Sequence, residues 1–371
     1  MKTKCVVNRK DLEKELAIAK KVIGTGCNLS ICQSVMLTFL TDNGLALECT
    51  NLEHAYMGVI GTQLNRKYRL PLMAKRILIN VDRLKRVVSA ISKKTTEISL
   101  EIAWDEDGLL VNGTTTIVRG GLITDYPDLP KLPWGKSYNL LSCDNLNQVN
   151  SIPASDERAH IISLYVDTKT GHIVSTDGSR LYIVQTLSIP NLKPFMILKN
   201  TAKILTTPQL KNEIGNVRVD DRHAFIETGH GFIAVRLLDG DFPDYESVID
   251  IINRDPVAVI STCDKQSMID VMAEAAGILD NNYRGVTFES EGGITVSASN
   301  PDFGTFEKDI SADFTFAGDE IKLAFNPGYM VDACNHIQDK GLNVLFYGED
   351  SPAIAESANG DFRAVIMPIR T

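Results

Sequence analysis

The sequence predicts an α+β protein made of three similar domains in tandem, each with two helices and antiparallel sheets. Three strand-like segments end in the same kind of turn, at Thr50–Asn51, Thr176–Asp177 and Ser299–Asn300, which start 126 and 123 residues apart. An aspartate–aromatic–proline motif also recurs, at Asp125–Asp128 and Asp241–Asp244. The chain has 371 residues, so three units of this period span it. Such a long period indicates repeated domains and not a solenoid of short repeats.

Proline-marked stretches that follow the repeat-end motif mark the expected domain boundaries. One lies at Pro127–Pro133 and the other at Ile252–Pro256. We therefore expect domains at residues 1–127, 128–253 and 254–371, each long enough to bury its own core.

Apolar residues at helical spacing predict the two helices of the first domain, Asn8–Ile23 and Val81–Ser92. Short segments in which apolar and polar residues alternate predict the strands around them. These strands are expected at Ser34–Leu40, Ala46–Thr50, Tyr56–Gln63, Glu97–Ile102, Leu109–Val111 and Thr116–Leu122.

The same patterns continue along the chain. They predict helices at Cys143–Ser151 and Lys199–Leu205 in the second domain, and at Lys265–Leu279 and Pro327–Ile337 in the third. Asn326 is a suitable N-cap for the last helix, because its side chain can accept a hydrogen bond from a free backbone N–H. The strands of the second domain are expected at Ile161–Asp167, His172–Thr176, Tyr182–Leu187, Asn216–Val219, Ala224–Thr228 and Phe232–Leu238.

The composition is that of an ordinary soluble globular protein, with 44% hydrophobic and 23% charged residues. No segment is typical of a signal peptide or a membrane span. The seven cysteines are scattered and form no Cys-x-x-Cys pair, which indicates reduced thiols in a cytoplasmic protein. The net charge of −9 argues against a generally basic surface but allows a local basic face.

The sequence contains no recognisable catalytic or cofactor motif. The six histidines show no His-x-x-x-His or His-Glu-x-x-His spacing, so we expect no zinc site. No P-loop is present, and Gly24–Gly26 has no later glycine in register for a dinucleotide site. The acidic stretches Asp105–Asp107 and Asp220–Asp221 are expected in surface turns. We therefore expect a protein without enzymatic activity, metal or cofactor.

Basic residues lie opposite the apolar stripes of the predicted helices. Lysine suits contacts with phosphates that do not read base edges, and a solvated helix face is the alternative explanation. The helix Lys265–Leu279 differs, because it carries Asp270 and Glu274. The candidate phosphate contacts are Lys10, Lys14, Lys21, Arg83, Arg86, Lys93, Lys199 and Lys203.

Five stretches resemble a known family, in the order and at the spacing of that family. The strongest are Ser175–Leu181 (STDGSRL), Leu238–Tyr245 (LDGDFPDY) and Val365–Arg370 (VIMPIR). Asn282–Val286 and Phe325–Tyr329 are lesser matches. Together with the threefold repeat, they make the chain similar to the bacterial DNA polymerase sliding clamp, the beta subunit of the replicative polymerase.

The resemblance implies a head-to-tail homodimer, in which six domains close into a ring around double-stranded DNA and helices line the hole. One contact type used twice closes such a ring. The implied partners bind through short peptide motifs and are the replicative DNA polymerase, the clamp loader and repair proteins. The stretch Gly26–Ile31 departs from the family, because it lacks the proline-rich, often arginine-containing turn that would supply one DNA contact.

The resemblance also implies a pocket for partner peptides at the junction of the second and third domains. Methionine and proline walls suit a short peptide with leucine or phenylalanine anchors, and Arg180 would contact peptide carbonyls or a carboxylate. The alternative is that the Thr-Asp-Gly segment is only a turn and the Val-Ile-Met segment only a core strand. The implied pocket residues are Ile161, Thr176, Gly178, Arg180, Leu181, Pro243, Val248, Asn326, Tyr329, Val365, Ile366, Met367, Pro368 and Ile369.

Three functions follow from these observations. The first is a non-catalytic processivity factor, which encircles duplex DNA and tethers a polymerase by raising its effective concentration. The second is a divergent clamp paralogue of phage or plasmid type with altered partner choice, suggested by the unusual first domain. The third is a three-domain hydrolase whose catalytic residues the motifs do not reveal.

Overall fold

The structure is a computed structural model of the chain. It describes residues 3–24, 29–61, 74–103, 108–112, 117–121, 123–153, 157–262, 264–280, 284–290, 293–310, 313–316, 321–348 and 350–369. The chain divides into two compact units. Unit 1 comprises residues 1–143 and 197–237, and unit 2 comprises residues 144–196 and 238–371. The expected boundaries between three domains stay predictions.

An antiparallel sheet of eleven described strands forms the core of unit 1. Its strand order is β1-β6-β7-β8-β5-β2-β3-β4-β15-β14-β13. The strands are β1 (Lys4–Asn8), β2 (Ser34–Phe39), β3 (Leu45–Thr50), β4 (His54–Ile60), β5 (Lys75–Asn80), β6 (Glu97–Ile102), β7 (Gly108–Val111), β8 (Ile117–Gly121), β13 (Val217–Val219), β14 (His223–Glu227) and β15 (Gly231–Arg236).

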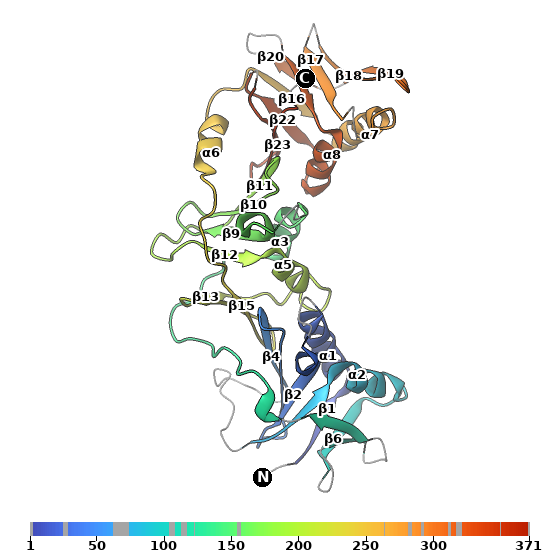
Figure 1. The fold of residues 1–371 in the computed structure, drawn as a ribbon, viewed down its shortest axis with the longest axis vertical. Helices are drawn as coiled ribbons and strands as arrows, with labels where there is room; N and C mark the ends of the chain where they lie inside the picture. The colour runs from blue at the N-terminus through green and yellow to red at the C-terminus, as the bar shows by residue number, and fades with distance from the viewer. Residues whose placement is uncertain are drawn as a thin grey trace. The chain divides into compact units, whose positions relative to one another are not determined.

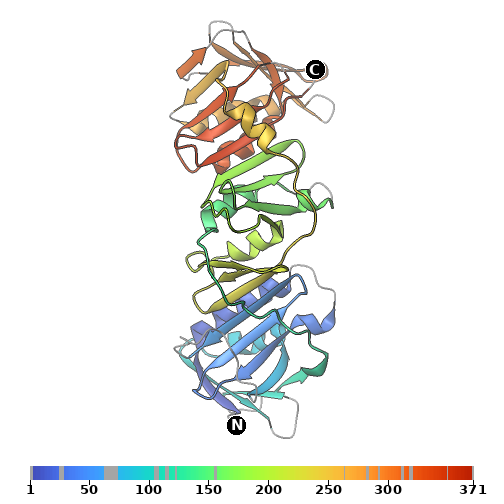
Figure 2. The same ribbon diagram turned by 90° about the vertical axis from the view of Figure 1, so that its left-hand side faces the viewer.

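Two helices lie side by side on one face of this sheet. Figure 1 shows α2 beside α1, and Figure 2 shows the strands in front of both. The helices of unit 1 are α1 (Arg9–Ile23), α2 (Val81–Ala90) and α5 (Lys199–Leu205), with the 3-10 helices η1 (Ser30–Gln33) and η2 (Ile123–Asp125). Asn8 caps α1, since its Oδ1 atom accepts a hydrogen bond from the Lys10 N–H at 2.8 Å. Asn80 caps α2 by accepting one from the Arg83 N–H at 3.1 Å.

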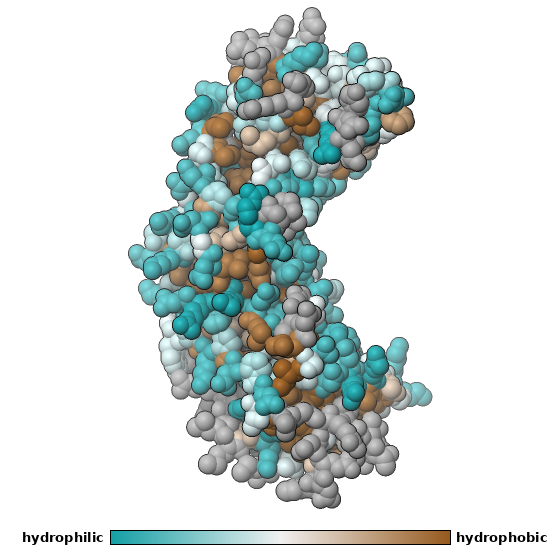
Figure 3. Space-filling view, viewed as in Figure 1, coloured by the Kyte–Doolittle hydropathy of each residue, from teal (hydrophilic) through white to brown (hydrophobic). Residues whose placement is uncertain are grey.

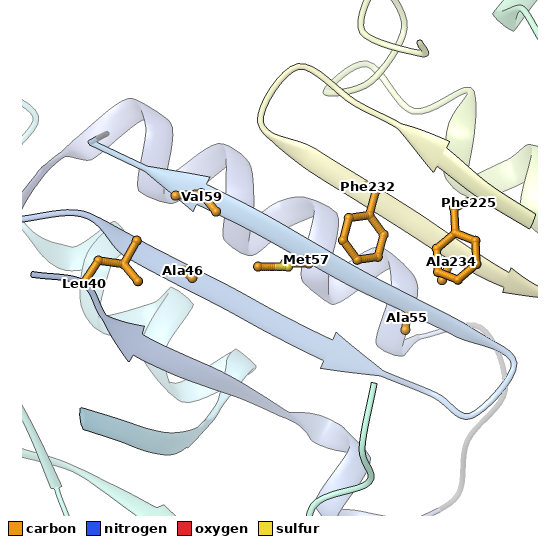
Figure 4. Close-up of a cluster of buried hydrophobic side chains, with 8 residues drawn as sticks. All are labelled: Leu40, Ala46, Ala55, Met57, Val59, Phe225, Phe232 and Ala234. Carbon is orange, nitrogen blue, oxygen red and sulfur yellow. The ribbon is translucent and has the colours of Figure 1, made fainter. Parts of the chain in front are cut away.

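Strands β4 and β15 join two distant parts of the sequence into one sheet. Gly231 of β15 pairs with Gly58 of β4. A Cβ atom added at Gly231 would lie 1.7 Å from the Met57 carbonyl oxygen, so the backbones approach too closely for any other residue. Figure 4 shows the buried cluster that covers this junction, which consists of Leu40, Ala46, Ala55, Met57, Val59, Phe225, Phe232 and Ala234.

A buried carboxylate links α1 to the same junction. Glu15 is fully buried and accepts a hydrogen bond from the Tyr56 hydroxyl group. Its other oxygen lies 3.2 Å from Nδ1 of His230, in the turn between β14 and β15. The interaction with Glu15 raises the pKa of His230 above its ordinary value, although burial opposes this shift. A Cβ atom at Gly58 would lie 1.9 Å from this carboxylate, so the glycine makes room for it.

Unit 2 contains two antiparallel sheets in the described residues. Their strand orders are β12-β9-β10-β11-β24-β23-β22-β16-β20 and β19-β18-β17-β21. The first sheet consists of β9 (Ser163–Asp167), β10 (His172–Thr176), β11 (Arg180–Gln185), β12 (Phe195–Leu198), β16 (Ala258–Thr262), β20 (Asp313–Phe316), β22 (Leu342–Phe346), β23 (Ala353–Ser357) and β24 (Phe362–Ile366). The second consists of β17 (Val286–Ser290), β18 (Ile294–Asn300), β19 (Gly304–Asp309) and β21 (Lys322–Phe325).

The helices of unit 2 include one closely packed pair, α7 and α8. Asn326 caps α8, because its Oδ1 atom accepts a hydrogen bond from the Gly328 N–H at 2.9 Å, and Pro327 occupies the first turn. The predicted cap is therefore confirmed. The helices are α3 (Cys143–Val149), α4 (Ala159–Ile162), α6 (Glu246–Ile252), α7 (Lys265–Ala276) and α8 (Pro327–His336).

The recurring strand-and-turn signature has a shared hydrogen-bond pattern. The Thr176 hydroxyl accepts a bond from the N–H two residues on, at 3.0 Å, and donates one to the carbonyl four residues on, at 2.7 Å. Thr50 makes the same two bonds, at 3.0 and 2.9 Å. All three copies share a further bond, in which the next side chain accepts from the N–H two residues on: Asn51 at 3.1 Å, Asp177 at 3.0 Å and Asn300 at 2.9 Å. Such bonds close turns locally, which explains why the sequence repeats there.

The predicted α+β class with antiparallel sheets is confirmed, and most predicted helices and strands are present within a few residues. The structure adds β1, β5, β12, α4 and α6, which the sequence analysis did not predict. These elements are short, and α6 forms just before the expected boundary at Ile252–Pro256. Asp220 lies in a turn as expected, where it accepts a bond from the Arg222 N–H at 2.8 Å. Asp105–Asp107 and Asn282–Tyr283 lie outside the described residues.

Candidate functional site

The turn between β10 and β11 is the centre of the predicted peptide site. Asp177 Oδ1 accepts hydrogen bonds from the N–H groups of Ser179 and Arg180, both at 3.0 Å. Gly178 has a φ of 90°, a left-handed conformation that favours glycine. A Cβ atom at Gly178 would meet nothing within 4 Å. Glycine is thus required here by the backbone conformation, and the space beside it is open.

Arg180 is held between two carboxylates and is only 4% exposed. Its Nε donates to Asp177 Oδ2 at 3.0 Å, and its Nη1 donates to Asp332 Oδ2 in α8 at 2.7 Å. The guanidinium carbon lies 4.3 Å from the centre of the Tyr329 ring. Burial lowers the pKa of Arg180, but the hydrogen bonds to Asp332 and Asp177 outweigh burial and raise it. Little of the Arg180 side chain is therefore exposed for the expected contact with a peptide.

The segment after β24 runs past this turn. β24 pairs with β11 in antiparallel register, with Val365 opposite Leu181. Beyond β24, the Met367 N–H donates to the carbonyl of the turn residue Ser179 at 3.1 Å. The Ile369 N–H donates to the carbonyl of Ala324 in β21 at 2.7 Å. Two backbone hydrogen bonds therefore connect the tail Met367–Ile369 to the rims of both sheets of unit 2.

An apolar cluster covers the face of β10, β11 and β24 that is opposite to Arg180 and α8. Tyr245, at the start of α6, donates its hydroxyl to the buried Asp167 at 2.8 Å, and the rings of Phe242 and Tyr165 stack 4.7 Å apart. These contacts hold the segment with Pro243 against the sheet. The cluster consists of Val174, Ile183, Tyr245, Ile354 and Val365, with Tyr165, Leu181, Phe242, Val248, Ile249, Leu345 and Tyr347 packed against it.

The predicted pocket residues all belong to unit 2, but they lie on both faces of the sheet that contains β11 and β24. Side chains alternate along a strand, so Leu181 and Val365 face α6, whereas Arg180 and its pairing partner Ile366 face α8. The exposed or half-buried members are Gly178, Leu181, Pro243, Val248, Asn326, Tyr329, Met367, Pro368 and Ile369. The buried members are Ile161, Thr176, Arg180, Val365 and Ile366. The buried group offers little surface to a ligand, and the pocket stays a prediction.

Most of the predicted phosphate contacts lie on the surface of unit 1, and Figure 3 shows hydrophilic side chains over α2. Lys14 is an exception, because it forms an ion pair with Glu213. Lys199 is a second exception: as the first residue of α5 it is only 6% exposed, so little of it can reach a phosphate. Lys85 of α2 is also exposed; it was not among the predicted contacts, although its position beside Arg86 could have indicated it. The exposed members are Lys10, Lys21, Arg83, Arg86, Lys93 and Lys203.

Other kinds of site find no support in the part of the chain that the structure describes. There, no group of three or more His, Cys, Asp and Glu side chains could hold a metal ion. Among these residues, no helix has the length and apolar character needed to cross a membrane. Burial raises the pKa of the Cys5 and Cys334 thiols to about 12, as expected for core cysteines. Cys27 and Cys263 lie outside the described residues.

Comparison with known proteins gives consistent results along the chain. Residues 254–370 match the family described as DNA polymerase III beta subunit, C-terminal domain. The beta sliding clamp of Pseudomonas putida is 24% identical over 98% of this chain and 99% of its own length. The beta sliding clamp of Bacillus subtilis is 24% identical over 77% of this chain and 79% of its own length.

Solved structures show the same fold. The DNA polymerase sliding clamp from Bacillus subtilis has a TM-score of 0.83 at 17% identity, with 99% of each chain covered. The clamp from Caulobacter crescentus has a TM-score of 0.82 at 20% identity, with 100% of each chain covered. A sliding clamp from Pseudomonas aeruginosa that is bound to griselimycin has a TM-score of 0.83 at 19% identity, with 99% of each chain covered.

Proposed function

We infer that the chain is a sliding clamp of the bacterial DNA polymerase III beta type, and we propose that it serves as a processivity factor in DNA replication. The observation that carries this proposal is the shared fold over the whole chain, with a TM-score of 0.83 over 99% of both chains. The family match of residues 254–370 agrees with it. A clamp acts by binding, so we propose a non-catalytic role in the cytoplasm. The relatives named above favour neither the hydrolase nor the phage-like paralogue.

The proposed clamp is a head-to-tail homodimer whose subunits close into a ring around duplex DNA. A heterologous contact that closes after two copies uses one interface twice. Size-exclusion chromatography with light scattering should therefore give about twice the chain mass of 40.8 kDa. This mass should persist on dilution to low micromolar concentration. A monomer under those conditions would contradict the ring.

The exposed cations of α1 and α2 are proposed to face DNA phosphates. Lysine and arginine side chains that neutralise phosphates release counterions, which makes binding weaken as salt rises. The double variant Lys21→Glu/Arg86→Glu should weaken binding to labelled duplex DNA in fluorescence anisotropy. It should also flatten the salt dependence, by roughly 0.9 in the log–log slope for each phosphate that the variant no longer neutralises.

The matched control for this variant is Lys131→Glu/Lys136→Glu, which makes the same change in net charge at two exposed lysines outside the helices. We expect it to have a much smaller effect on the salt slope. Equal effects of the two double variants would show that overall charge, and not the helix surface, governs DNA binding.

The exposed part of the predicted pocket is proposed to bind peptide motifs of the polymerase, the clamp loader and repair proteins. Leu181 of β11 and Val248 of α6 supply half-buried apolar surface, and Met367 is 45% exposed at the start of the tail. Flexible methionine beside apolar walls suits short peptides with large apolar anchors. Griselimycin, which is bound to the Pseudomonas aeruginosa clamp, is the proposed test ligand for the same surface in this chain.

A further inference from the structure

Arg180 connects three segments of unit 2 that are far apart in the sequence. It starts β11, its guanidinium group bonds to Asp332 in α8, and the carbonyl of the preceding residue, Ser179, accepts the N–H of Met367 in the tail. The Tyr329 ring lies against the guanidinium group at 4.3 Å. The turn and α8 therefore meet at the Arg180 side chain, and the tail is bonded to the turn residue that precedes Arg180.

The geometry of this arginine is that of a structural bridge. A buried cation is stable only when its hydrogen-bond donors are satisfied by well-placed acceptors. Arg180 bonds Asp177 on one side and Asp332 on the other, at 3.0 and 2.7 Å. Its planar guanidinium group can bond both carboxylates and stack on an aromatic ring at once, which a lysine cannot do. The side chain of Asp332 is 47% exposed, so it is the accessible end of the bridge.

We propose that the Asp177–Arg180–Asp332 bridge is a positioning device for the peptide site: it holds Tyr329 and α8 against the β10–β11 turn, to which the tail Met367–Ile369 is bonded through Met367. This inference rests on the proposed peptide-binding function. Arg180 acts through Tyr329 and the β10–β11 turn, and Asp332 is the residue that selects the orientation of α8. This role differs from the direct peptide contact that the sequence-based interpretation gives to Arg180, which stays a prediction.

The variant Asp332→Asn removes the negative charge at the exposed end of the bridge and keeps the size of the side chain. Asp332→Glu keeps the charge, and Asp255→Asn is the control, because Asp255 is an exposed aspartate of the same unit. Two measurements are made on the full-length protein. Hydrogen–deuterium exchange reports the opening of residues 177–181 and 326–332 without ligand, and isothermal titration reports the affinity for griselimycin.

Asp332→Asn should increase exchange in both segments and weaken griselimycin binding by about tenfold, the size expected for loss of a hydrogen bond between charged groups. Asp332→Glu should recover most of the affinity, and Asp255→Asn should match the wild type. Circular dichroism of all variants should be unchanged. If Asp332→Asn does not fold, Arg180→Lys is used, and we expect the same two effects from it.

The outcomes separate the bridge from the site. Unchanged exchange in Asp332→Asn would overturn the positioning role, whether or not griselimycin binds. Faster exchange with unchanged affinity would overturn the link between the bridge and the ligand. If the wild type does not bind griselimycin, the proposed peptide site is wrong for this ligand, and the exchange data alone then support or overturn the bridge.

Discussion

Deletion of Met367–Thr371 should abolish the binding of griselimycin and leave the fold of unit 2 intact. Met367 is 45% exposed, and the described part of the tail is joined to the rest of unit 2 by the backbone bonds of Met367 and Ile369, at 3.1 and 2.7 Å. The deletion begins only after Ile366, because Val365 and Ile366 are buried in β24 between β11 and β23. A longer deletion would remove part of the sheet and destroy the core.

Isothermal titration measures this effect, and circular dichroism checks the fold. The control deletion removes only the last two residues, so that the Ile369 N–H keeps its partner. The variant Met367→Asp serves as a second test without a change in length, because a charge on an exposed apolar wall should also prevent an apolar anchor from docking. Wild-type affinity in the long deletion would place the ligand elsewhere on the molecule.

Gly231→Ala should destabilise unit 1 by about 3 kcal/mol, at the upper end of the usual cost of overpacking. Its new Cβ atom would meet the Met57 carbonyl oxygen at 1.7 Å, and a backbone atom cannot move aside as a flexible side chain can. β15 must therefore separate from β4, which exposes the cluster around Phe232 and weakens the interaction between Glu15 and His230.

Urea denaturation followed by circular dichroism checks this prediction through the midpoint of the first transition. Gly293→Ala is the matched control, because a Cβ atom there meets nothing within 4 Å. The stability of this variant should stay within about 0.5 kcal/mol of the wild type. A wild-type midpoint for Gly231→Ala would mean that the two strands are not held at the spacing that the structure shows.

Local patterns predicted many of the elements, because their causes lie within a few residues. The apolar residues of Asn8–Ile23 recur at helical spacing, and α1 buries that side. The cap at Asn326 also depends on neighbours along the chain. The turn at Thr176 closes with bonds to residues two and four positions on. Each of these features is visible in the sequence as a short pattern.

Short elements with weak patterns were missed for the same reason. β1 alternates buried and exposed residues over only five positions, Lys4–Asn8, which is too short to stand out from chance alternation. α6 lies just before the stretch expected to separate two domains, and its Val248 and Ile249 pack on the sheet. Tertiary burial stabilises both elements, and local propensity alone does not.

The candidate site could be predicted only in part from such local patterns. The resemblance to sliding clamps indicated its residues, but not which side chains are exposed. Arg180 and Asp332 are 152 residues apart in the sequence, and nothing near either one signals the pair. Lys199 shows the same limit: it follows the basic pattern of its segment, yet it is 6% exposed.

By itself, the sequence predicted a threefold repeat and determined the helices with strong periodicity, the caps and turns, and the likeness to sliding clamps. Only the tertiary structure decided which face of a strand meets a helix, which cations reach the surface, and that Arg180 bonds to protein carboxylates. The physical reason is the range of the interactions. Propensity and capping act between close neighbours in the chain, whereas burial and ion pairing depend on residues that only folding brings together.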